Sequence, residues 1–327
     1  MSRFKLVMMG TGEFALPSFA ALYETPHEVV GLFTQPDRTG SGHHRSLENP
    51  MKRLAIEHST PVFQPENVNA PEALAELRNL NADLLIVAAY GQILSPTLLG
   101  IPRLGAINVH ASLLPKYRGA APVAYAILNG DTETGVSIIQ VLPQLDAGPI
   151  LAVVSTPIGS EETAGGLEVR LARLAVEVLP PVIAQFAAGN VRPLPQSAAL
   201  VTRAPKLKKQ MGAINWNRSA IQIDCHVRAM QPWPNPHTFL HISGRPPQRL
   251  LILSVKLAEE ARSDVLPGTP LRVGKQQVVV QTGQGALEIL QIQPEGKRPM
   301  SIADFLRGRS ISQDDRFGPE SLPQQPS

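Results

Sequence analysis

The first 189 residues alternate between short apolar runs and segments whose apolar residues recur with helical spacing. The apolar runs predict strands over residues 4–9, 29–34, 61–63, 83–89, 106–110, 136–142 and 150–156. The segments with helical spacing predict helices over residues 17–23, 49–58, 71–80, 122–129 and 163–188. Strands that alternate with helices are typical of an α/β fold, so we expect a Rossmann-like domain with a mostly parallel sheet.

The pattern changes after Met211. A predicted helix over residues 219–230 is followed by short strands over residues 250–257, 271–273, 277–282 and 287–293, separated by turn signals such as Pro267-Gly268. Short strands at this spacing predict a small β-barrel. Residues 191–205 contain three prolines and are typical of a linker. We therefore predict a first domain over 1–189, a linker over 190–209, a barrel domain over 210–309 and a flexible tail over 310–327.

Charge divides the chain in the same way. Residues 1–189 hold 12 Lys and Arg against 17 Asp and Glu, a net charge of −5, whereas residues 190–327 hold 18 against 10, a net charge of +8. A basic second half favours a polyanionic partner. No continuous apolar run approaches the roughly 18 residues of a membrane span, and the first ten residues are too short for a signal peptide. Cys225 is the single cysteine, which excludes an internal disulfide and suits the cytoplasm.

Candidate chemistry lies at the end of the strand over residues 106–110. Asn108 and His110 are two residues apart, so their side chains share one face of an extended strand. An amide beside an imidazole can stabilise a developing oxyanion, and Asp146 is the candidate to orient and charge the ring. A strand that merely ends in polar residues explains the same spacing. However, Gln92, Asn108, His110 and Asp146 all lie at or just beyond the carboxyl ends of predicted strands, and sites in such sheets gather at those ends.

The sequence INVHASLLPKYRGAAP, followed by LDAGPIL, resembles the signature of the folate-dependent formyltransferases. With YRGAAP directly after SLLPK, it is most similar to the methionyl-tRNA formyltransferases. The resemblance implies transfer of a formyl group from 10-formyltetrahydrofolate to methionyl-tRNA by a monomeric cytoplasmic enzyme without a metal, with Asn108, His110 and Asp146 as the catalytic group. It also implies a folate pocket lined by Gln92, Ile93, Leu94, Ser112, Leu113, Leu114 and Pro115.

The second half carries its own resemblance, in the motifs NW, PWP, TGQGAL and QPEGKRPM. These match the OB-like C-terminal domain of the same family, which implies tRNA binding. A basic loop over residues 35–49 occupies the place where the family inserts a loop into the acceptor stem. This chain has Ser-Gly-His-His-Arg where the family commonly has Gly-Arg-Gly-Lys-Lys, so Arg38 and Arg45 supply the charge. Lys206, Lys208 and Lys209 form a second basic cluster, which either contacts phosphates or is simply solvated.

Other readings of the sequence remain open. Gly10, Gly12 and Ala15 match the dinucleotide fingerprint G-x-G-x-x-A, with Asp37 near the end of the next strand, which would indicate a nicotinamide-dependent oxidoreductase. The same glycines are also needed simply to pack a helix on its strand. A tRNA-binding protein without activity and a sugar-nucleotide formyltransferase are further alternatives. Glycinamide ribonucleotide formyltransferase and formyltetrahydrofolate hydrolase share the catalytic group but lack the basic barrel.

Overall fold

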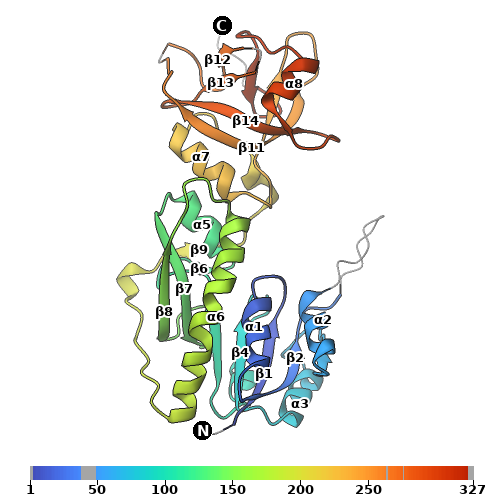
Figure 1. Cartoon of the computed structure of the whole chain (residues 1–327), viewed down its shortest axis with the longest axis vertical. Coiled ribbons are helices and arrows are strands. Elements are labelled where there is room, and N and C mark those ends of the chain that lie inside the picture. Colours follow the sequence, from blue (N-terminus) through green and yellow to red (C-terminus); the bar gives the residue numbers. More distant parts are fainter. Residues whose placement is uncertain (1–2, 38–48, 263, 275, 323–327) are drawn as a thin grey trace. The chain divides into compact units, whose positions relative to one another are not determined.

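A computed structural model describes residues 3–37, 49–262, 264–274 and 276–322 (Figure 1). The chain forms two compact units, which are described separately. The first comprises residues 1–122, 133–157 and 166–205, and the second comprises residues 123–132, 158–165 and 206–327. The second unit thus includes two short pieces of the first half of the sequence as well as the basic C-terminal part.

The first unit is built on a seven-stranded sheet in the order β3-β2-β1-β4-β5-β7-β8. Its strands are β1 (Lys5–Gly10), β2 (Glu28–Phe33), β3 (Val62–Phe63), β4 (Leu84–Ala88), β5 (Ala106–His110), β7 (Glu133–Gln140) and β8 (Ile150–Pro157). The pairs from β3 to β5 are parallel, whereas β7 runs antiparallel to β5 and β8. The predicted mostly parallel sheet is therefore confirmed.

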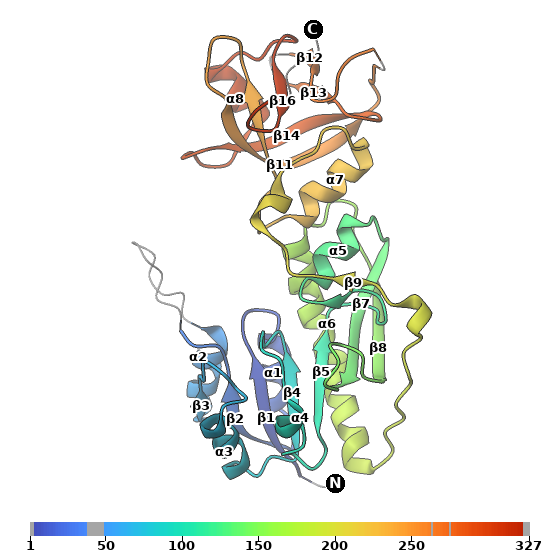
Figure 2. The same cartoon turned by 180° about the vertical axis from the view of Figure 1, so that it is seen from behind.

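Helices cover both faces of this sheet. They are α1 (Leu16–Tyr23), α2 (Pro50–Glu57), α3 (Pro71–Asn79), α4 (Pro96–Leu99) and α6 (Ala164–Ala188), and a further helix, α5, spans Pro122–Leu128. Prolines in the first turn start α2, α3 and α4, where no backbone N–H is needed. Residues of α3 and α4 pack against the sheet face that carries Val7 and Met9, and Figure 2 shows both helices in front of the sheet.

Close packing explains Gly10, the first glycine of the dinucleotide-like fingerprint. A Cβ at Gly10 would lie 2.6 Å from Cε2 of Phe19 and 2.7 Å from the carbonyl oxygen of Ala88. Phe19, on α1, is fully buried at this point. The glycine is thus required for the helix to pack on its strand, without any ligand.

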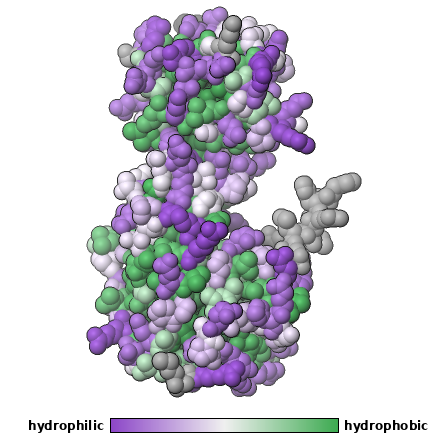
Figure 3. Space-filling model, viewed as in Figure 1, coloured by the Kyte–Doolittle hydropathy of each residue, from purple (hydrophilic) through white to green (hydrophobic). Residues whose placement is uncertain are grey.

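Helix α6 has 25 residues and is long and apolar enough to cross a membrane by length and composition alone. Its buried residues recur at helical spacing, as Leu167, Leu171, Ala175, Leu179 and Val182 show. Arg173 and Glu177 interrupt the apolar stretch, and the surface where α6 lies carries both polar and apolar residues (Figure 3). The core helix of a globular domain has these same features, so the length of α6 is weak evidence for a membrane span.

The second unit contains an antiparallel sheet in the order β12-β13-β14-β11-β10-β16, with β15 paired to β14. The strands are β10 (His237–His241), β11 (Gln248–Ala258), β12 (Pro270–Val273), β13 (Val278–Gln281), β14 (Ala286–Pro294), β15 (Met300–Ser301) and β16 (Arg316–Gly318). Helices α7 (Ala220–Ala229) and α8 (Ile302–Gly308) contribute Ile223 and Phe305 to the core that this sheet encloses. The sheet curves into a half-barrel, as the strand pattern predicted.

The end of the chain differs from the loose tail expected from residue 310. Residues 316–318 form β16, which pairs with β10, and Phe317 is buried in the core of the half-barrel. The Phe317 N–H donates to the carbonyl oxygen of Gly268 at 2.8 Å, beside the start of β12. This contact requires glycine at position 268, because a Cβ there would lie 2.0 Å from the Phe317 carbonyl oxygen. A few isolated apolar residues in a polar stretch were too weak a signal to predict this strand.

Residues 190–205 also differ from a free linker. Leu194 and Ile150 exchange two backbone hydrogen bonds of 2.8 Å. After a short 3-10 helix (Ala198–Leu200), β9 (Arg203–Ala204) pairs in parallel with β6 (Arg118–Gly119). This stretch is therefore part of the first unit, and it runs beside the loop that follows β5.

Candidate active site

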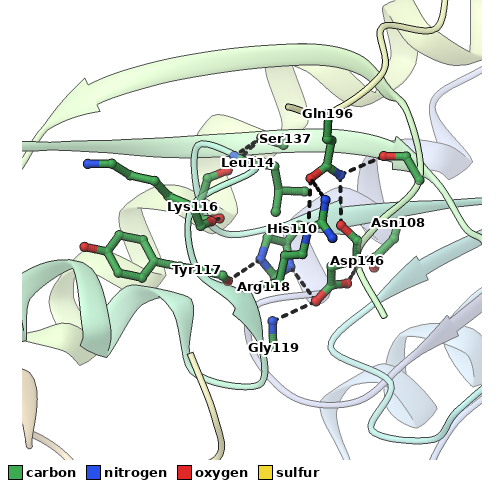
Figure 4. Close-up of polar contacts among 12 residues, drawn as sticks. Asn108, His110, Leu114, Lys116, Tyr117, Arg118, Gly119, Ser137, Asp146 and Gln196 are labelled. Atoms are coloured by element: carbon green, nitrogen blue, oxygen red, sulfur yellow. Dashed lines mark hydrogen bonds and ion pairs between the residues drawn. The ribbon is translucent and has the colours of Figure 1, made fainter. Parts of the chain in front are cut away.

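Asn108 and His110 project from the carboxyl end of β5 to the same side, where both approach Asp146 (Figure 4). The Asn108 amide Nδ2 donates to Oδ1 of Asp146 at 3.4 Å. The His110 Nδ1 lies 3.8 Å from Oδ2 of the same carboxylate. The side chains of His110 and Asp146 are only 6% and 10% exposed, so the pair is largely shielded from water. The structure thus brings together the three residues that the sequence singled out.

Asp146 is held by a contact that the sequence did not reveal. The backbone N–H of Gly119 donates to Asp146 Oδ2 at 2.8 Å. Asp146 itself has a φ of 48°, a conformation that aspartate tolerates better than most residues. A Cβ at Gly119 would lie 2.5 Å from the carbonyl oxygen of Ala204. Glycine at this position therefore lets the chain pass close to β9 while its N–H faces the carboxylate.

His110 has a second partner, the carbonyl oxygen of Tyr117, which lies 3.0 Å from Nε2. Because a carbonyl can only accept, Nε2 carries the proton and donates. The distance from Nδ1 to Asp146 exceeds a normal hydrogen-bond length. The ring orientation is therefore fixed mainly by Tyr117, while Asp146 contributes its charge from the other side.

Comparison with known proteins decides the family of this chain. Residues 3–183 match the formyl transferase family model, and residues 206–310 match the model of the formyl transferase C-terminal domain. The methionyl-tRNA formyltransferase of Citrifermentans bemidjiense is 41% identical over 311 residues, which cover 95% of each chain. That of Pseudoalteromonas translucida is also 41% identical, over 307 residues and 94% of each chain. The chain belongs to the methionyl-tRNA formyltransferase family.

Solved structures of low sequence identity show the same fold. The sugar 3N-formyl transferase WlaRD superposes with a TM-score of 0.65 at 17% identity, covering 91% of this formyltransferase and 100% of WlaRD. HypX from Aquifex aeolicus, solved with tetrahydrofolic acid, gives a TM-score of 0.60 at 18% identity over 93% of this formyltransferase and 47% of HypX.

The family assignment argues against the alternatives from other functional classes. Asp37, which a dinucleotide site would use for the ribose, instead accepts hydrogen bonds from Lys52 at 2.6 Å and from Gln64 at 3.0 Å. The hydrogen bond from Lys52 is the main cause that lowers the pKa of Asp37. Gly10 and Asp37 of the dinucleotide-like fingerprint thus have structural roles that require no nicotinamide ligand.

The residues expected to line the folate pocket differ in what their side chains do. The Gln92 amide accepts from the backbone N–H of Val68 at 2.8 Å and donates to the carbonyl oxygen of Pro65 at 3.1 Å. Leu94 is buried in the core beneath this loop, whereas Ile93 is 77% exposed. Of these three side chains, that of Ile93 is the most accessible to a ligand, and Gln92 serves to hold the loop.

The loop after β5 is stabilised by its own polar residues. The Ser112 hydroxyl donates to the carbonyl oxygen of Lys116 at 2.6 Å, and the Ser137 hydroxyl donates to that of Ser112 at 2.7 Å. The Leu114 N–H in turn donates to the Ser137 hydroxyl oxygen at 3.1 Å. Ser112 and Leu114 are buried, while Leu113 and Pro115 are half-buried. Ser112 thus shapes the loop and is not itself exposed to a ligand.

The basic residues expected to contact tRNA are only partly described. Lys206, Lys208 and Lys209 are all exposed, and none of them forms an ion pair with another residue of the described parts of the chain. Arg38 and Arg45, with the His43-His44 pair, lie outside the described residues. Across the described ranges, no group of three His, Cys, Asp or Glu residues is placed to hold a metal ion. Cys225 is buried, and burial raises the pKa of its thiol, as expected for a packing residue.

Sequence reasoning missed Arg118 and Gln196 at this site. The Arg118 guanidinium donates to Gln196 Oε1 from Nε at 3.0 Å and from Nη2 at 2.7 Å. The Gln196 amide Nε2 donates to the carbonyl oxygens of Asp146 at 2.8 Å and Gly148 at 2.7 Å. Gln196 stands in a proline-rich stretch with no periodicity, so nothing local indicated these contacts.

Proposed function

We propose that this formyltransferase transfers the formyl group of 10-formyltetrahydrofolate to the α-amino group of methionyl-tRNA for translation initiation. The neutral amine attacks the formyl carbon, and a new C–N bond forms as negative charge builds on the formyl oxygen. The bond to N10 of the folate then breaks, and the proton lost by the amine passes to the departing folate. The products are N-formylmethionyl-tRNA and tetrahydrofolate.

Asn108 is proposed to donate to the formyl oxygen. One N–H of its amide is directed at Asp146 Oδ1, which leaves the second N–H for the substrate. Because a carboxylate only accepts hydrogen bonds, it fixes which end of the Asn108 amide carries the NH₂ group. A donor that is already oriented needs no reorganisation as charge develops, which is the basis of oxyanion stabilisation.

His110 is proposed to assist through Nδ1. Its Nε2 is engaged by the Tyr117 carbonyl, and the 3.8 Å separation from Asp146 leaves Nδ1 without a close acceptor. A protonated ring would face oxygens on both sides and donate from Nδ1 to the formyl oxygen. As the intermediate collapses, the same nitrogen can relay the amine proton. Asp146 would stabilise the charged ring, in addition to orienting Asn108.

Binding of the tRNA is proposed to rest on the basic second half of the chain. The exposed Lys206, Lys208 and Lys209 are suited to phosphate contacts because no carboxylate in the described chain neutralises them. Arg38 and Arg45 are proposed to act at the acceptor end. Arg45→Ala should therefore lower the single-turnover rate more than it weakens tRNA binding, because the amine would be misplaced relative to the formyl group.

The observation that carries this proposal is the convergence of Asn108 and His110 on one buried carboxylate. The experiment is a single-turnover assay with methionyl-tRNA charged with labelled methionine, supplied with 10-formyltetrahydrofolate, with tetrahydrofolate plus formate, or with no folate. Labelled N-formylmethionine should form only with the first. Formation of product with the second or third, or no product with the first, would overturn the assignment of the donor.

A further inference from the structure

The segment of residues 194–204, termed here the crossing segment, is attached to the first unit at both ends. Leu194 pairs with Ile150, close behind the Asp146 loop, and Arg203 and Ala204 pair with Arg118 and Gly119. Between these two attachments the segment places two polar side chains, Gln196 and Thr202, against the elements that carry the catalytic group.

Gln196 uses both ends of its amide to connect two separate loops. Its Nε2 donates to two carbonyl oxygens of the Asp146 loop, those of Asp146 itself and of Gly148. Its Oε1 accepts two hydrogen bonds from Arg118, the neighbour of the Gly119 N–H that holds the Asp146 carboxylate. Figure 4 shows the Gln196 amide lying between the Arg118 guanidinium and the Asp146 loop. The backbone carbonyl of Asp146 is thus held by Gln196, which Arg118 holds in turn, and the Asp146 carboxylate is held by the adjacent Gly119.

Thr202 reaches His110 through Tyr117. The Tyr117 N–H donates to the Thr202 hydroxyl oxygen at 2.8 Å, and the Tyr117 carbonyl accepts from His110 Nε2 at 3.0 Å. Tyr117 has a φ of 63°, which is unfavourable for an aromatic residue and needs support from its surroundings. The hydrogen bond to Thr202 gives part of that support, and so helps to place the carbonyl that orients the imidazole.

We propose that the crossing segment positions the catalytic group, with Gln196 acting on Asp146 and Thr202 acting on His110. This inference rests on the catalytic roles proposed above. Neither residue touches the reacting atoms, so both are positioning residues. Loss of Gln196 frees the Asp146 loop from two hydrogen bonds and leaves Arg118 without its acceptor. A displacement of about 1 Å in a catalytic geometry can lower the rate by roughly 10²-fold.

The first test compares Gln196→Ala with the unaltered enzyme in single-turnover formylation at saturating methionyl-tRNA and 10-formyltetrahydrofolate. The rate should fall by about 10- to 100-fold, while the Kd for tRNA and the KM for the folate change less than threefold. Gln231→Ala is the matched control, because the Gln231 amide also donates to two carbonyl oxygens, those of Val227 and Leu253, in the second unit. It should lower the melting temperature but leave the saturated rate unchanged.

Gln196→Glu separates the two functions of the amide. A carboxylate still accepts from Arg118 but cannot donate to the carbonyl oxygens of Asp146 and Gly148. If the hydrogen bonds from Gln196 Nε2 to the Asp146 loop are what supports the rate, Gln196→Glu should be as slow as Gln196→Ala. A normal rate in Gln196→Glu would overturn the role assigned to these two hydrogen bonds.

For Thr202, the single-turnover rate should fall in Thr202→Val and be restored in Thr202→Ser, which keeps the hydroxyl. Equal rates in both Thr202 variants would overturn its role.

A double-substitution cycle with Asp146→Asn distinguishes this inference from the proposed function. If Gln196 acts by placing the carboxylate, Gln196→Ala should cost much less in the Asp146→Asn background than alone. Fully additive losses would overturn the inference and leave the role of Asp146 intact. A near-normal rate in Asp146→Asn would instead overturn the proposed function. A normal rate in Gln196→Ala beside a slow Asp146→Asn would overturn the inference alone.

Discussion

Replacing Asp146 by asparagine removes one charge and one of the two acceptor oxygens from the candidate active site while preserving side-chain volume. In the structure, Oδ2 accepts from the Gly119 N–H at 2.8 Å and Oδ1 accepts from Asn108 at 3.4 Å. The new amide can keep only one of these contacts, because it has one oxygen and one NH₂ group. If its oxygen stays on Gly119, its NH₂ faces the Asn108 NH₂. Asn108 must then turn its amide over, which moves its donor away from the formyl oxygen.

The loss of charge adds to this effect. The Asp146 carboxylate lies 3.8 Å from Nδ1 of His110, so its charge stabilises the imidazole when the ring carries a proton in the transition state, and an asparagine does not supply that charge. Loss of an oriented oxyanion donor typically costs about 10²–10³. Because the two effects share one carboxylate they do not add fully, and we expect the single-turnover rate of Asp146→Asn to fall by about 10³-fold.

The assay is single-turnover formylation with excess enzyme over labelled methionyl-tRNA, followed between about pH 6 and 8, the range in which histidine changes charge. Asp83→Asn is the matched control. The Asp83 carboxylate also accepts from a backbone N–H, that of Lys5 at 2.8 Å, and pairs with a cation, Arg103, at 2.8 Å. It lies just before β4, at the opposite end of the strands from Asp146. Asp83→Asn should lower stability without lowering the saturated rate.

Two results would refute this reasoning. If Asp146→Asn keeps within tenfold of the normal rate across the whole pH range, the carboxylate neither orients Asn108 nor charges His110. If Asp83→Asn loses rate as strongly as Asp146→Asn, the effect comes from general destabilisation and not from the site.

Three further predictions concern Asn108, the lysine cluster at residues 206–209 and His226. Asn108→Ala should lower turnover by about 10²–10³ without loss of folding, and near-normal turnover would remove Asn108 from the mechanism. Replacing Lys206, Lys208 and Lys209 together by glutamine should weaken tRNA binding and flatten its dependence on salt, with folate binding unaffected; an unchanged salt slope would refute phosphate contact. Burial lowers the pKa of His226, which also lies near the Gly212 carbonyl. Since the ring of His226 then takes up a proton more readily in the unfolded chain than in the folded one, stability should fall as the pH drops below about 6.5. The melting temperature of His226→Gln should therefore fall less between about pH 7.5 and 5.5 than that of the unaltered enzyme.

Local periodicity was enough to predict the seven strands of the main sheet and its longer helices, but not the short elements α4, β6 and β9. The run over residues 84–89 is apolar throughout because β4 is buried on both faces, and the structure places β4 at the centre of the seven-stranded sheet, between β1 and β5. The alternation of a strand also predicted that Asn108 and His110 share one side, since that follows from a repeat of two residues. The motif around them was specific enough to indicate the family.

The details of the site depend on contacts between residues far apart in the sequence. Gly119 and Asp146 are 27 residues apart, Arg118 and Gln196 are 78 apart, and Tyr117 and Thr202 are 85 apart. Such hydrogen bonds have no period and no fixed spacing. Residues 190–205 therefore resembled a linker, because prolines and scattered polar residues indicate only that a segment is neither helix nor central strand.

The sequence by itself determined the fold class, the family and the three candidate catalytic residues, because each depends on short-range spacing or on a contiguous motif. The tertiary structure decided what holds those residues in place. Only the folded chain shows that the Tyr117 carbonyl orients His110, that the Gly119 N–H holds Asp146, and that Phe317 completes the half-barrel. These outcomes depend on which groups meet when distant segments pack together, and a buried polar group must then find whichever partner that packing brings within reach.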